Sequence, residues 1–103
     1  RMTVQRLLVR SISNYFELAE GFSVVEITAP KGIIGSSIQT LDLRRKFRIN
    51  LVAIKTVETS PTGSKIVKSF NPVPDPAHKI VEGEILAFAG SVLDIANFIG
   101  HYE

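Results

Sequence analysis

The stretch from residue 35 to residue 55 constrains the fold of this chain more than any other. Ser36 is predicted to cap a helix, because Gln39 follows three residues later at the spacing of a capping box. This helix is predicted to end at about Phe47. The segment 50–57, with an apolar run over residues 51–54, follows at once and predicts a buried strand. A helix that leads straight into a buried strand indicates a domain in which helices pack on a sheet.

Cationic side chains gather where this helix meets the strand: Arg44, Arg45, Lys46 and Arg48. Asp42 precedes them at a spacing that places it beside Arg45 or Lys46 on a helix. Cations this close together repel one another unless water or an anion screens them. Two interpretations stay open. The junction binds an anionic ligand, or it is a solvated helix end whose cations meet the negative end of the helix dipole.

The composition narrows the class of protein. A length of 103 residues suits one domain. No apolar run approaches the roughly 18 residues that a membrane span needs, so no direct membrane insertion is predicted. The net charge of +2, with no tryptophan and two tyrosines, does not favour nucleic-acid binding. The chain has no cysteine, which excludes disulfides, thiolate metal sites and a thiol nucleophile.

No motif in the chain predicts catalysis. His78 and His101 lack a metal-ligand spacing, and both are predicted to be exposed. Ser36 and Ser37 follow a glycine but form no nucleophile elbow. We therefore predict no catalytic residue, no metal site, no cofactor and no enzyme activity. A small enzyme or a nucleic-acid binder that uses the basic junction remains an alternative of another class.

Hydrophobic periodicity predicts the remaining elements. Residues 1–18 follow helical spacing from the first residue, which suggests a domain cut from a longer protein. The predicted strands are residues 22–28, 50–57, 65–70 and 85–89. Ser91 and Asp94 predict the cap of a last helix that Gly100 ends. The expected fold is therefore α+β, with a small, mainly antiparallel sheet and helices on it.

Over about residues 15–99 the chain resembles the RCK C-terminal lobe, or TrkA C-terminal domain, of KtrA-like potassium transport regulators. The segments that carry the resemblance are residues 22–27, 41–47, 51–55, 71–75 and 82–90. The resemblance implies a βαβββα lobe over residues 19–103 that forms a homodimer. It also implies that residues 1–18 are a linker helix from a preceding nucleotide-binding lobe.

The resemblance further implies a cytoplasmic regulatory domain that works at the inner face of the membrane. Its partner would be a membrane-embedded cation channel or transporter subunit, and a ligand would gate transport. The implied ligand is a small anionic nucleotide, cyclic di-AMP, bound at the dimer interface. The positions that match the family's ligand residues are Ile38, Gln39, Asp42, Arg44, Lys46, Arg48, Ile49, Asn50, Leu51 and Pro74. The alternative is a dimerisation lobe without ligand, on a cation antiporter or another transporter.

The resemblance assigns chemical roles within this set. Arg44 would contact a phosphate, and Asn50 a base edge. Asp42 would orient Arg44 or accept an exocyclic amine. Apolar side chains would hold the adenines: Ile38, Ile49 and Leu51. Arg45 and Arg48 depart from the pattern, because small or neutral residues are expected at these positions.

Overall fold

The computed structural model describes residues 12–103. Five strands, three α-helices and one short 3-10 helix make up this part of the chain. In chain order they are β1 (Ile12–Ala19), β2 (Phe22–Thr28), η1 (Lys31–Ile33), α2 (Ile38–Leu41), α3 (Leu43–Phe47), β3 (Asn50–Thr59), β4 (Lys65–Asn71), β5 (Ile85–Ser91) and α4 (Val92–Tyr102). No helix within residues 12–103 has the length and apolar character needed to cross a bilayer.

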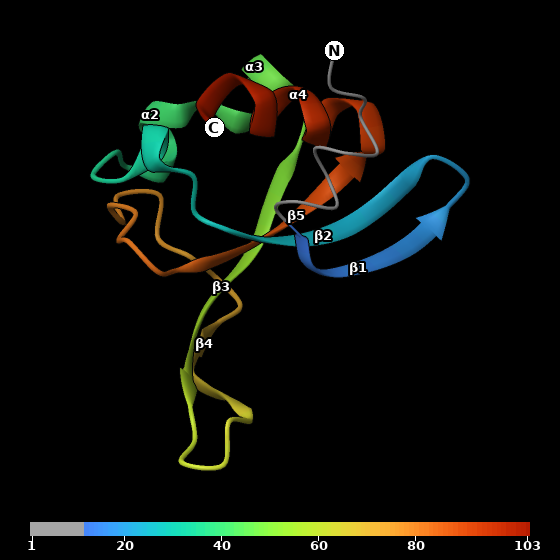
Figure 1. Ribbon diagram of the computed structural model, residues 1–103. Helices are drawn as coiled ribbons and strands as arrows, with labels where there is room; N and C mark the ends of the chain where they lie inside the picture. The colour runs from blue at the N-terminus through green and yellow to red at the C-terminus, as the bar shows by residue number, and fades with distance from the viewer. Residues whose placement is uncertain (1–11) are drawn as a thin grey trace.

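The strands form a single sheet in the order β1-β2-β5-β3-β4, and every neighbouring pair is antiparallel. The described helices α2, α3 and α4 lie on the same side of this sheet (Figure 1). From β2 to α4 the elements follow the predicted βαβββα order. The expectation of an α+β fold with an antiparallel sheet is therefore confirmed.

The hydrophobic core lies between the central strands and α4. Alternate residues of β2 and β5 point toward the helices, as period-two alternation requires. The most deeply buried side chains include Val25, Ile27, Leu86, Phe88, Ile95, Phe98 and Ile99, each at most 1% exposed. The Phe98 ring meets Phe88 at 4.9 Å and Phe47 edge-on at 5.2 Å, between ring centroids. Phe47 is the last residue of α3, so this packing fixes the end of that helix.

The predicted helix over residues 1–18 is wrong for the part that the structure describes. Residues 12–18 belong to strand β1, and residues 1–11 lie outside the described range. Ala19 pairs with Phe22 across a two-residue turn, in which Gly21 has a φ of 81°. Such a turn joins antiparallel strands and does not end a helix. A linker from a preceding lobe remains a prediction.

The helix before the junction also differs from the prediction. Ser37, and not Ser36, caps it: the Ser37 hydroxyl accepts a hydrogen bond from the Thr40 N–H at 3.2 Å. Asp42 adopts a left-handed conformation, with φ 52° and ψ 49°, and divides the predicted helix into α2 and α3. The cap of α4 is as predicted, since the Ser91 hydroxyl accepts from the Asp94 N–H at 3.1 Å. However, α4 continues past Gly100 to Tyr102.

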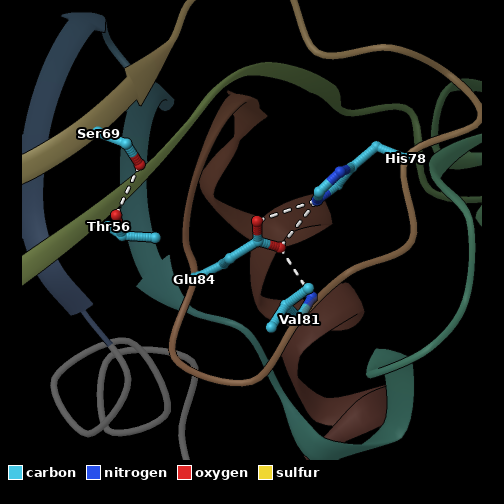
Figure 2. Close-up of polar contacts among 5 residues, drawn as sticks. All are labelled: Thr56, Ser69, His78, Val81 and Glu84. Atoms are coloured by element: carbon cyan, nitrogen blue, oxygen red, sulfur yellow. Dashed lines mark hydrogen bonds and ion pairs between the residues drawn. The ribbon is translucent and has the colours of Figure 1, made fainter.

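The hairpin of β3 and β4 extends away from the helices (Figure 1). The Gly63 N–H donates to the Ser60 carbonyl at 2.9 Å, which closes the predicted turn. The hydroxyls of Thr56 and Ser69 lie 2.6 Å apart and link the two strands (Figure 2). Strand β4 is one of the two edge strands of the sheet, and all seven of its residues are exposed.

Candidate functional site

The backbone around α3 is unusual at both ends of the helix. Asp42 precedes α3 and Arg48 follows it, and both have positive φ, 52° and 60°. The Arg48 N–H donates to the Arg44 carbonyl at 3.2 Å, as at a helix end that glycine usually occupies. A residue with a Cβ in this conformation costs about 1 kcal/mol. Strain of this kind is concentrated at ligand sites.

Two hollows lie on either side of this junction. The first, here called the helix hollow, has a volume of about 350 Å³ and is lined by Ile38, Gln39, Asp42, Leu43, Arg44, Asn50 and Leu51. The second, here called the arginine hollow, measures about 560 Å³ and is lined by Phe22, Arg44, Arg45, Arg48, Ile49, Asn50, Gly90, Ser91 and Asp94. Arg44 and Asn50 line both hollows, so they separate one from the other.

The charge at the junction is only partly balanced. Asp42 forms an ion pair with the Arg45 guanidinium, one of the two partners expected from sequence. Within residues 12–103, Arg44, Lys46 and Arg48 form no ion pair, and all three are exposed. The site therefore carries an excess of positive charge that an anion can neutralise.

The structure brings most of the predicted ligand residues together. Six of them line the helix hollow: Ile38, Gln39, Asp42, Arg44, Asn50 and Leu51. Arg48 and Ile49 line the arginine hollow, and Lys46 and Pro74 line neither. The Ile49 side chain is 1% exposed and belongs to the core, which limits what it offers to an adenine. The Asp42 carboxylate pairs with Arg45, so no described contact shows it orienting Arg44.

The proline-containing loop between β4 and β5 holds the start of α2. The Ile38 N–H donates to the His78 carbonyl at 3.0 Å, and the Gln39 N–H donates to the Pro76 carbonyl at 2.9 Å. Amide groups in the first turn of a helix lack partners within the helix itself, so the loop carbonyls satisfy them. The loop thereby positions Ile38 and Gln39 at the helix hollow.

A carboxylate at the end of this loop holds the loop in place. Glu84 is 8% exposed and accepts from the Val81 N–H at 2.8 Å. The Nε2 atom of His78 lies 3.0 Å from each Glu84 oxygen (Figure 2). His78 is therefore half-buried and paired, which corrects the prediction of an exposed histidine. The only hint in the sequence was that His78 and Glu84 lie six positions apart in the same loop.

Sequence reasoning missed the outer wall of the arginine hollow. Phe22, Gly90 and Asp94 come from β2, β5 and α4, far along the chain from the junction. No local spacing connects them to the arginines, because the pairing of β5 with both β2 and β3 brings them to the junction. Within residues 12–103 no three histidine or carboxylate side chains are grouped so that they could hold a metal ion.

Comparison with known proteins identifies the family. No protein-family model matches the chain. The chain is 31% identical to the RCK C domain of the potassium transport protein KtrA, solved in complex with cyclic di-AMP. The match covers 82% of this chain and 87% of that domain, with a TM-score of 0.64. The chain belongs to the RCK C domain family.

One further relative and one structural match are similar to this chain. Ktr system potassium uptake protein C of Bacillus subtilis (strain 168) is 35% identical over 92 residues, which are 89% of this RCK C domain. The chain spans 37% of the length of that protein. The GsuK channel bound to NAD is 22% identical, with a TM-score of 0.58 over 81% of this chain and 14% of the channel chain. This last likeness supports the fold alone.

Proposed function

We propose that this RCK C domain regulates a potassium channel or transporter by binding cyclic di-AMP between two copies of the chain. The helix hollow carries the proposal, because it gathers six of the ten predicted ligand residues. The likeness to the KtrA domain solved with cyclic di-AMP supports the choice of ligand. The domain would work in the cytoplasm, at the inner face of the membrane, through its transport partner and without catalysis.

The side chains of the helix hollow suit the parts of this ligand. Arg44 is exposed, and a guanidinium can bind phosphate through two parallel hydrogen bonds. Ile38 and Leu51 are half-buried, so each offers apolar surface to an adenine while it stays anchored. The Asn50 amide both donates and accepts, which suits the edge of a base.

Symmetry explains why such a ligand belongs between two chains. Cyclic di-AMP has two phosphates related by a two-fold axis, and a two-fold dimer presents the same hollow twice. One ligand would then contact Arg44 of both copies. A ligand that binds one arrangement of the two domains more tightly shifts the population toward it, and the attached transport machinery responds to that shift.

Calorimetric titration of the chain with cyclic di-AMP tests this function. The expected stoichiometry is one ligand per two chains. Arg44→Ala should lose about 2–4 kcal/mol of binding free energy, the range for removing one member of a desolvated charge pair. Lys65→Ala, which removes a cation from β4 on the distal hairpin, should lose almost nothing. Absence of heat with the wild-type chain excludes the ligand, and equal losses at both positions indicate general electrostatics.

A dimerisation lobe without ligand is the second candidate function. It is favoured by large apolar side chains that stand exposed on the described surface, such as Phe16 at 65% and Phe70 at 60%. Apolar surface of this kind is typical of protein interfaces. This function predicts a dimer in sedimentation together with no heat on adding cyclic di-AMP.

A further inference from the structure

We propose that the arginine hollow is a second anion site, which binds a phosphate-bearing ligand with two or more negative charges. The proposal goes beyond the function proposed above and does not depend on cyclic di-AMP. The two hollows share Arg44 and Asn50. The other lining residues of the arginine hollow come from β2, β5, the start of α4 and the end of α3.

Three arginines line this hollow: Arg44, Arg45 and Arg48. Arg44 and Arg48 have no ion pair within the described residues. Arg45 uses its Nε for Asp42, which leaves its terminal N–H groups for another acceptor. The volume of about 560 Å³ lies in the range of small-molecule sites. Three planar donor groups around one concavity suit the oxygens of phosphate.

Arg48 stands at a backbone position that glycine would occupy without strain. Its φ of 60° and ψ of 34° place it in the left-handed region. An arginine there costs stability, and its side chain makes no ion pair with the described residues. In this position Arg48 lines the arginine hollow, where it adds a positive charge.

Asp94 offsets part of the positive charge of the arginine hollow. It is the one carboxylate among the described residues that line the hollow. Three arginines and one aspartate leave an excess of positive charge at the hollow, and the attraction to that excess grows with the negative charge of the ligand. A group with two or more charges therefore gains more here than a carboxylate with one. The lining therefore favours phosphate and polyphosphate groups over carboxylates.

The test is a titration of the full 103-residue chain with pyrophosphate, followed by NMR amide shifts at constant ionic strength. Saturable shifts are expected at residues of the arginine hollow. Arg48→Gly should weaken binding about tenfold, as for one lost charge-assisted contact, while the thermal midpoint without ligand stays the same or rises. Asp94→Asn should strengthen binding about twofold or more, because a repulsive charge is removed.

Lys65→Gln is the matched control, since it removes one positive charge from β4 and should leave pyrophosphate binding unchanged. Acetate at the same concentration should not displace pyrophosphate. The proposal is overturned if no saturation is reached, if Lys65→Gln weakens binding as much as Arg48→Gly, or if Asp94→Asn fails to strengthen it. Neither Arg48 nor Asp94 lines the helix hollow, so the effects of these two substitutions test the arginine hollow and leave cyclic di-AMP in the helix hollow to its own titration.

Discussion

A single glycine allows the 3-10 helix η1 and the end of α4 to pack closely against each other. Gly32 lies in η1, where the end of α4 comes nearest to it. A Cβ built on Gly32 would lie 2.8 Å from the Tyr102 carbonyl oxygen and 3.1 Å from the Tyr102 ring. Because the nearer atom belongs to the backbone, it cannot move aside by changing a rotamer. Glycine at this position is therefore required by space.

We predict that Gly32→Ala destabilises the domain by about 1–3 kcal/mol, the usual cost of overpacking. Urea denaturation measures the change in the free energy of unfolding. Gly90→Ala is the comparison, since its Cβ would meet the Cγ2 atom of Ile49 at 3.0 Å, where a side chain can yield. It should cost less. A Gly32→Ala variant as stable as the wild type would show that the end of α4 is free to move.

At the scale of elements, burial decides what the sequence could predict. The alternation of buried and exposed residues in β2 predicted its bounds, Phe22–Thr28, correctly. In β1, seven of eight residues are exposed, and the strand pairs on one side only. Its apolar residues, such as Phe16 and Leu18, therefore do not form the alternating pattern that would have predicted a strand with one buried face. The left-handed Asp42 was equally invisible, because no spacing marks a residue that interrupts a helix.

The candidate site also has a part that the sequence could predict and a part that it could not. The residues of the helix hollow lie within positions 38–51, so a local pattern and a family resemblance could find them together. The arginine hollow also needs Phe22 and Asp94, which the sheet brings to the junction. Strand β5 pairs with β3 on one side and with β2 on the other, and α4 follows β5 directly. The contact between His78 and Glu84 depends on the path of the loop, which the prolines restrict but do not specify.

Glu84 holds the loop whose carbonyls accept hydrogen bonds from the first amides of α2. We therefore predict that Glu84→Ala loosens the start of α2. The Val81 N–H and His78 lose their shared partner, and bonds to a charged group contribute about 1.5–3 kcal/mol. Hydrogen exchange of the Ile38 and Gln39 amides should accelerate, because their acceptors belong to the loop.

Amides of β2, such as that of Val25, serve as the internal control, since they bond within the sheet. Their exchange should change little relative to the amides of α2. A uniform acceleration across the domain would contradict the idea of a local support. It would mean that Glu84 stabilises the whole fold and does not position the helix hollow in particular.

At the scale of the whole molecule, the described surface is mixed in character. The helices cover one face of the sheet, and apolar side chains stand exposed at several places: Phe16, Leu18, Phe22, Phe70 and Leu93 are each more than half exposed. A domain of this size gains stability by pairing such surface with a second copy. We expect a homodimer, and a monomer at high micromolar concentration in sedimentation would count against it.

Dimerisation and ligand binding should be coupled if cyclic di-AMP lies between two copies. A ligand that contacts both chains binds the dimer and not the separate monomers, so by linkage it must tighten the dimer by the same factor. We predict that cyclic di-AMP lowers the dissociation constant of the wild-type dimer in sedimentation equilibrium. Arg44→Ala should abolish this effect of the ligand. The ligand-free dimer should persist, because the exposed Arg44 side chain would contact the phosphate and adds no apolar area to the dimer interface. If the ligand binds and the dimer constant does not change, each chain holds its own ligand and the helix hollow is complete without a partner.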